Sequence, residues 1–140
     1  MEMQIKLLTD SAKMPSYAHA DDAGMDLYAD EKVLLEAGAR VQVKSGIAVA
    51  IPKGHVGLLW DKSGLSHKSG LKMLGGVIDA GYRGEVIVGI HNLGTETVAI
   101  ESGQKIAQML IQPILQPQLT EVNELSATER GDGGFGSTGV

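Results

Sequence analysis

The fold class follows from one stretch, Ile47-Ala-Val-Ala-Ile-Pro-Lys-Gly-His-Val-Gly-Leu-Leu-Trp60. Its first five residues alternate between branched apolar and small side chains at a period of two, which is typical of a half-buried strand. Pro52-Lys-Gly54 then signals a turn, and the apolar run after it predicts a second strand. Strand, turn and strand therefore follow one another within fourteen residues.

The same pattern continues in both directions along the chain. Further strand candidates lie at residues 1–9, 23–29, 33–35, 41–43, 86–90, 98–100 and 106–111. No stretch of twelve residues shows a helical period with caps, although one helical turn is expected near Leu65–His67. Short strands separated by turns at this spacing predict an all-β sandwich or barrel.

The composition fits one domain and excludes several classes of protein. The 140 residues include 19 glycines, about twice average usage, which favours tight turns. A net charge of −5 argues against direct nucleic acid binding. The absence of cysteine excludes disulfides and thiolate metal sites. No run of 18 apolar residues predicts a membrane span, and no signal peptide is recognised, so we expect a cytoplasmic location.

The last fifteen residues, Ser126–Val140, contain one bulky apolar side chain. Such a segment buries too little surface to offset its ordering entropy, so we expect a domain over 1–125 and a flexible arm over 126–140. The arm nevertheless carries groups that suit a nucleotide: a guanidinium fork, a ring for base stacking, glycine amides and two hydroxyls. These groups belong to Arg130, Phe135, Gly136, Ser137 and Thr138. A frayed terminus is the alternative.

Two internal stretches carry candidate chemistry. In Gly75-Gly-Val-Ile-Asp-Ala-Gly-Tyr-Arg-Gly-Glu85, Asp79 follows an apolar pair and could accept a proton from water, with Tyr82 across the turn as a floor for a sugar. Lys62, Ser63 and Gly64 form a compact clamp for phosphate. The alternatives are a plain β-hairpin with a solvated aspartate and a polar surface loop.

Two polar residues interrupt apolar stretches. Asp26 lies within Ala23–Ala29, where an unpaired carboxylate is costly to bury, so it is expected to pair with a cation or to touch hydrated Mg²⁺. Gln108 interrupts the strand at 106–111 and is either a structural amide or a substrate donor. The four histidines have no ligand spacing, so no zinc site is expected.

Taken in order, five motifs resemble those of the trimeric dUTPase family. They are Ala23-Gly-Met-Asp-Leu-Tyr28, Lys62-Ser-Gly-Leu-Ser66, Gly76-Val-Ile-Asp-Ala-Gly-Tyr-Arg-Gly-Glu-Val86, Gly103-Gln-Lys-Ile-Ala-Gln108 and Arg130-Gly-Asp-Gly-Gly-Phe-Gly-Ser-Thr-Gly139. The resemblance implies a distorted antiparallel jelly-roll-like β-barrel. It also implies a homotrimer with three active sites at subunit interfaces, which hydrolyses dUTP to dUMP and pyrophosphate and so limits uracil incorporation into DNA.

The resemblance also implies a role for each matching residue. Main-chain groups of Gly76, Val77 and Ile78 would read uracil, while Asp79 would bind the 3′-hydroxyl and orient the attacking water. Tyr82 would pack against the deoxyribose. The phosphates would be held by Lys62, Ser63, Gly64 and Gln108. The arm of another subunit would stack Phe135 on uracil and grip the γ-phosphate with Arg130, Gly136, Ser137 and Thr138. Mg²⁺ would bind the triphosphate with no direct protein ligand, Asp26 touching it at most through water.

Two positions depart from the family pattern. Lys62 stands where arginine is usual, which keeps the charge but loses the bidentate fork, so Lys68 or Lys72 is a candidate to compensate. Met73 stands where some relatives place an asparagine near the base.

Three other functions fit the sequence less well than dUTP hydrolysis. A dCTP deaminase of the same fold would need a glutamate ten residues after Asp79, where this chain has Gly89. A binding protein without turnover does not require the intact Asp79 and the complete arm, and a structural β-rich protein leaves the arm unexplained.

Overall fold

The computed structural model describes residues 1–137 and 139. Within them it has ten short strands and one short helix. They are β1 (Gln4–Leu7), β2 (Met25–Tyr28), β3 (Val33–Leu35), β4 (Arg40–Ala50), β5 (His55–Asp61), α1 (Ser63–Ser69), β6 (Leu71–Leu74), β7 (Val77–Ile78), β8 (Glu85–Asn92), β9 (Val98–Ile100) and β10 (Lys105–Pro113). In this described part of the chain, no helix is long and apolar enough to cross a membrane.

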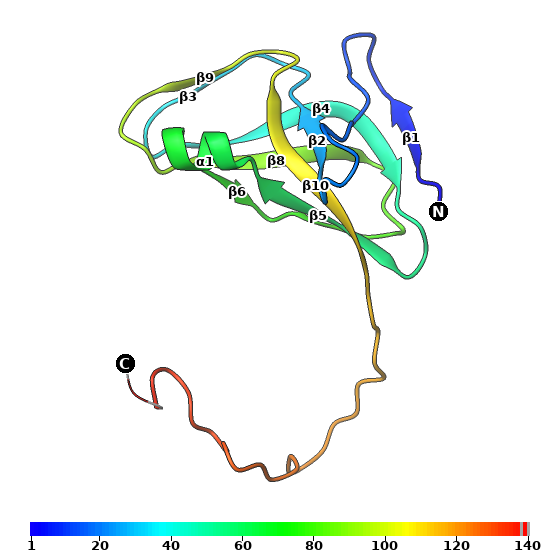
Figure 1. Cartoon of the computed structure of the whole chain (residues 1–140), viewed down its shortest axis with the longest axis vertical. Coiled ribbons are helices and arrows are strands. Elements are labelled where there is room, and N and C mark those ends of the chain that lie inside the picture. The colour runs from blue at the N-terminus through cyan, green and yellow to red at the C-terminus, as the bar shows by residue number, and fades with distance from the viewer. Residues whose placement is uncertain (138, 140) are drawn as a thin grey trace.

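The strands form two four-stranded sheets and one two-stranded sheet, all antiparallel. Their orders are β1-β4-β8-β6, β2-β10-β5-β7 and β3-β9. The sheets curve around a shared interior to form a distorted jelly-roll-like barrel (Figure 1). The predicted all-β fold class is therefore confirmed, and so is the predicted helical turn near Leu65, which belongs to α1.

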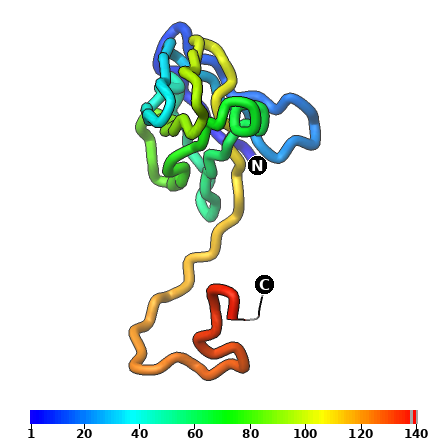
Figure 2. The backbone as a smooth tube through the Cα atoms, turned by 90° about the vertical axis from the view of Figure 1, so that its left-hand side faces the viewer, coloured from blue at the N-terminus to red at the C-terminus, as the bar shows by residue number. Residues whose placement is uncertain are grey.

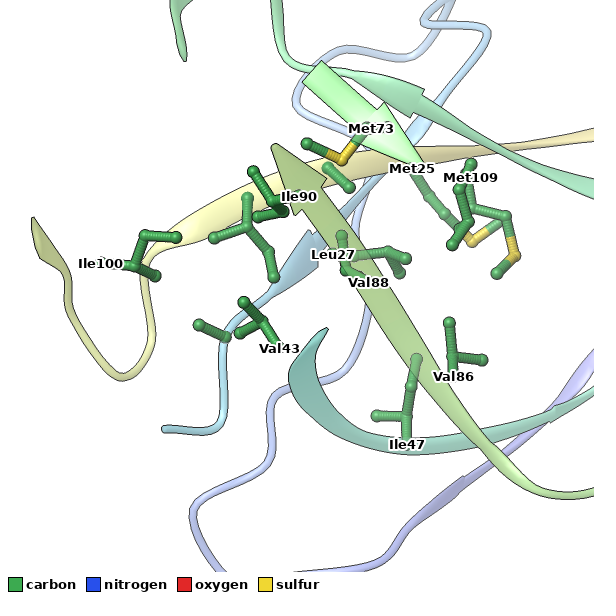
Figure 3. Close-up of a cluster of buried hydrophobic side chains, with 14 of the residues drawn as sticks. Met25, Leu27, Val43, Ile47, Met73, Val86, Val88, Ile90, Ile100 and Met109 are labelled. Carbon is green, nitrogen blue, oxygen red and sulfur yellow. The ribbon is translucent and has the colours of Figure 1, made fainter. Parts of the chain in front are cut away.

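The core lies between the two larger sheets, and β8 shows how the sequence builds it. Along this strand buried and half-buried residues alternate, and Val86, Val88 and Ile90 have no exposed surface. Their side chains meet Leu27 and Met109 from the opposite sheet (Figure 3). Burial of such side chains stabilises a fold by about 1.5–3 kcal/mol each, so period-two alternation fixes which face of β8 points inward.

A plain β-hairpin, one of the alternatives for Gly75–Glu85, is not what this segment forms. Strand β8 pairs with β6, Leu74 lying opposite Gly89, whereas β7 crosses to the other sheet and pairs with β5. The crossing depends on Gly76, whose φ is +107° and whose missing Cβ would lie 2.9 Å from the Leu59 carbonyl oxygen. The segment is thus a bridge between two sheets, because Val77 and Ile78 find partners on β5 rather than on β8.

The chain leaves the barrel after β10. The amide of Ile114 still donates to the carbonyl of Gly54 at 2.9 Å. Beyond it the chain runs away from the barrel in both views (Figures 1 and 2). Within the described residues, no hydrogen bond joins 115–137 to the barrel. Four bulky apolar side chains of this segment are therefore exposed: Leu115, Leu119, Val122 and Leu125.

Candidate functional site

Asp79 lies at the mouth of a small pocket. It follows β7 directly and is exposed, and its carbonyl accepts a hydrogen bond from the Tyr82 amide at 3.0 Å, which closes a turn. A pocket of about 180 Å³ opens beside this turn. Its lining is formed by Val77, Ile78, Asp79, Tyr82, Glu85 and Ile87. The structure therefore brings the candidate carboxylate and the candidate aromatic floor together.

The ring of Tyr82 is held in place from two sides. Its hydroxyl donates to the Glu85 carbonyl at 2.9 Å. Its ring packs on Gly84, where an added Cβ would lie only 2.6 Å from the Tyr82 Cζ. Because Gly84 has no side chain, the ring lies flat across the turn and forms one wall of the pocket.

The outer edge of β7 is open. This strand is the last in its sheet, so it has a partner on one side only. The Gly76 carbonyl accepts from the Leu59 amide at 2.8 Å, and Ile78 pairs with Gly57. Backbone groups alternate in direction along an antiparallel strand, so the N–H and C=O of Val77 point away from β5. One donor and one acceptor thus lie beside the Asp79 pocket.

Lys62 belongs to a second cluster, at the far end of β5. It immediately precedes α1, and Ser63 and Gly64 form the first turn of that helix, whose amides have no carbonyl partner within the helix. The Lys62 ammonium donates to Oδ1 of Asp26. The Lys105 ammonium lies 2.7 Å from Oδ2 of the same carboxylate. Asp26 itself is only 2% exposed.

Two lysines keep Asp26 ionised. Burial alone would raise the pKa of this carboxyl group, but the ammonium groups of Lys105 and Lys62 outweigh burial and hold the pKa below its ordinary value. The contact with Asp26 raises the pKa of Lys105 in turn. The expected cation partner of Asp26 is thus present, and the second lysine was not foreseen from the sequence.

Gln108 ties the strands around this cluster together. Its side-chain amide donates to the Asp61 carbonyl at 2.9 Å. Its chain fills the space that Gly24 leaves open, since a Cβ there would lie 2.5 Å from the Gln108 Oε1. The Asp61 carboxylate in turn accepts from the Met73 amide at 2.7 Å and pairs with Lys72 at 2.5 Å.

The two lysines proposed to compensate for the missing arginine do not join Lys62 on Asp26. Lys72 is engaged by Asp61, and Lys68 is in the last turn of α1. The buried Met73 turns its backbone amide to Asp61. Among the described residues, no group of three or more His, Asp or Glu side chains could hold a metal ion.

The arm forms a third group of candidate residues. Arg130 donates from Nε to the Gly133 carbonyl at 2.8 Å, and Ser137 donates from its amide to Gly134 at 3.0 Å. Phe135 is fully exposed and has a positive φ of 48°, followed by Gly136 at 90°. Thr138 lies outside the described residues. These turns present the ring and the amides without contact with the barrel.

Within a single chain, Asp79, Lys62 and the C-terminal arm lie apart from one another. Asp79 follows Ile78, which pairs with Gly57, while Lys62 lies five residues beyond Gly57, just past the end of β5. At roughly 3.3 Å per residue, Asp79 and Lys62 are about 20 Å apart along the strand. The candidate base, the candidate phosphate clamp and the arm are thus three separate groups.

Comparison with known proteins gives one consistent result. A family model described as dUTPase matches residues 10–139. A deoxyuridine 5′-triphosphate nucleotidohydrolase from Clostridium tetani is 44% identical over 98% of this chain and 96% of its own length. One from Mycobacterium marinum is 48% identical over 90% of this chain and 87% of its own length.

Solved structures agree with these relatives. The dUTPase of Staphylococcus bacteriophage 80alpha with dUpNHpp has a TM-score of 0.94 at 38% identity, over 99% of both chains. A mutant dUTPase from phage phi11 of S. aureus, described with a structural Mg(II) ion, has a TM-score of 0.84 at 35% identity, over 89% of this chain and 98% of that one.

The lowered pKa of Asp26 predicts how stability responds to acid. A carboxyl group with a lowered folded pKa stabilises the fold above the unfolded value of about 3.9, and this contribution is lost as pH falls through the folded value. We expect Asp26→Asn to be destabilised by about 1–3 kcal/mol at pH 7 and to lose less stability than the wild type in acid. Urea unfolding between pH 7 and acid measures this. The exposed Asp10→Asn serves as the control, and equal acid sensitivity of Asp26→Asn and wild type would contradict it.

Proposed function

The chain belongs to the dUTPase family, and we propose that it hydrolyses dUTP to dUMP and pyrophosphate. The observation that carries this proposal is the pocket in which exposed Asp79 lies beside Tyr82 and the open edge of β7. Such a pocket offers a carboxylate, a flat wall for a sugar and a main-chain donor and acceptor for a pyrimidine. Removal of dUTP would limit uracil incorporation into DNA and supply dUMP for thymidylate synthesis.

Uracil would be read by the backbone of Gly76, Val77 and Ile78. The outward N–H and C=O of Val77 complement one carbonyl and the imide N–H of the base. Tyr82 would pack on the deoxyribose, and its tether to Glu85 fixes how close it comes to the 2′ carbon. A rigid wall there would leave no room for the 2′-hydroxyl of a ribonucleotide.

The Asp79 carboxylate would accept a hydrogen bond from the 3′-hydroxyl and would orient the attacking water. The water oxygen bonds to the α-phosphorus, the bond to the bridging oxygen breaks, and pyrophosphate leaves, while the proton of the water passes to Asp79. Exposed Asp79 needs little basicity for this role, since positioning and charge neutralisation carry most phosphoryl chemistry.

Lys62, Ser63, Gly64 and Gln108 would hold the phosphates. Magnesium would arrive with the triphosphate, where it neutralises phosphate charge. Both oxygens of Asp26 face ammonium groups, so this residue suits a contact with the metal through water better than a direct bond.

The separation of the groups supports shared sites in a homotrimer. Asp79 and Lys62 of one chain lie near opposite ends of β5, about 20 Å apart along the strand, which favours a site that takes them from two chains. Residues 114–125 would dock on a neighbour, because their exposed leucines gain by burial. Residues 126–140 would then close a site, with Phe135 on uracil and Arg130, Gly136, Ser137 and Thr138 on the γ-phosphate.

A dCTP deaminase-like activity is the alternative within the fold. Its glutamate would fall at Gly89 on β8, where no carboxylate is present. A side chain there would also be confined, since its Cβ would lie 3.1 Å from the Leu74 carbonyl oxygen. This position favours hydrolysis.

A release assay with four nucleotides tests the proposal. We expect pyrophosphate from dUTP in the presence of Mg²⁺, much less from dCTP, dTTP and UTP, and a large loss with chelator. Ammonia release from dCTP would support the deaminase instead. Purified protein that left dUTP intact would overturn the proposal.

Replacement of Asp79 separates binding from turnover. We expect Asp79→Asn to bind dUTP but to lose at least ~100-fold in kcat, the lower end for general acid–base catalysis. Single-turnover kinetics and dUTP titration measure the two effects. Asp10→Asn should behave as wild type, and near-normal kcat in Asp79→Asn would remove this residue from the mechanism.

Two truncations separate docking from closure. Deletion of 129–140 should leave a folded trimer with almost no turnover, because closure that excludes water is lost. Deletion of 115–140 also removes Leu115, Leu119, Val122 and Leu125 and should weaken the trimer itself. Light scattering and pyrophosphate release measure both. Full activity after the shorter deletion would show that the arm does not close the site.

A further inference from the structure

One buried carboxylate is shared by two lysines that come from different parts of the fold. Asp26 lies on β2, Lys62 precedes α1, and Lys105 begins β10. The side chain of Asp26 is 3% exposed, whereas those of Lys62 and Lys105 are 30% and 46% exposed. The carboxylate therefore lies beneath two ammonium groups that reach the surface.

The cluster holds one more lysine than a simple ion pair. In this triad two ammonium groups face the one carboxylate of Asp26, beside Ser63 and Gly64, while the Asp22 carboxylate acts on Lys105 as well. A lone Lys62–Asp26 pair would be neutral. It would also resist separation, since a buried carboxylate without a partner is strongly destabilising.

We propose that Lys105 is a positioning residue that keeps Asp26 neutralised, so that Lys62 is free to leave Asp26 and bind the triphosphate. The inference rests on the proposed function of this site, and it adds Lys105 to the residues that serve it. Lys62 donates to Oδ1, and its departure towards a phosphate leaves Lys105 in place on Oδ2. The buried charge stays compensated in both states.

The contact with Asp26 raises the pKa of Lys105, so the ammonium form that neutralises the carboxylate is further stabilised. The arrangement also explains how a lysine serves where the family usually has arginine. A lysine ammonium lacks the planar fork with which an arginine can hold two acceptors side by side, so a lysine already paired with Asp26 gains from being able to change partner.

The experiment is a cycle of variants assayed for KM and kcat with dUTP. Lys105→Gln should raise KM about tenfold, with kcat changed less than about threefold, because Lys62 becomes locked on Asp26. Lys105→Arg should restore KM. The control is Lys32→Gln, which breaks the exposed Lys32–Glu101 pair of 3.0 Å and should change neither constant.

Removal of the carboxylate provides the decisive comparison. In the Asp26→Asn background Lys105 has no charge to neutralise, so adding Lys105→Gln should change KM less than about twofold. This pair also keeps the test valid if Lys105→Gln alone does not fold. A tenfold rise in KM in that background would show that Lys105 binds phosphate itself and would overturn the proposal.

Two more results would overturn it: an unchanged KM in folded Lys105→Gln, or a Lys105→Arg variant as poor as Lys105→Gln. In either case normal turnover by the wild type would leave the proposed function standing. Wild-type protein inactive on dUTP would instead refute the proposed function and this inference together.

Discussion

Strand β5 sets the distances on which the other features depend. It is hydrogen-bonded on both sides, to β10 along most of its length and to β7 near its start. A strand held on both sides cannot bend to bring its ends together. Asp79, delivered by β7, and Lys62, which follows β5, are therefore fixed about 20 Å apart. This spacing is consistent with the proposed sites that take the two residues from different chains.

The position of β5 depends on two glycines, Gly57 and Gly76. A Cβ at Gly57 would lie 3.0 Å from the Ile51 Cδ1, so this glycine lets β5 approach the core. Gly76 does the same from the other side, where its Cβ would meet the Leu59 carbonyl oxygen. Close backbone approach at both points holds β7 on the sheet while its outer edge stays open. These glycines thus shape the open edge of β7 as well as turns.

The sequence predicts the β-rich fold well because alternation is a local signal. Ile47, Val49 and Ile51 are buried as their period indicates, although Ala48 between them is buried too, so this stretch is not half-buried. Pairing is not local, so the sequence left a plain hairpin at Gly75–Glu85 open as an alternative. Residues Val77 and Ile78 do not reveal that their partner is β5 rather than β8. The second lysine on Asp26 was missed for the same reason, since Lys105 lies 79 positions from its partner in sequence and the register of β10 on β2 brings them together.

The Asp26 cluster shows why a change from arginine to lysine cannot be judged at one position. Considered alone, Lys62 should bind phosphate less well than arginine, because the guanidinium fork that can hold two acceptors is replaced by a point charge. When Lys105 is considered as well, positive charge beside α1 is retained. The two contacts that one arginine could make at once are then divided between two lysine side chains. Each lysine pays its own rotamer entropy, so the shared arrangement is less rigid than a fork. It has one advantage that a fork lacks: one cation can move to a ligand while the other keeps the buried carboxylate compensated. Lys62 and Lys105 therefore have to be considered together, because both contact the same buried carboxylate of Asp26.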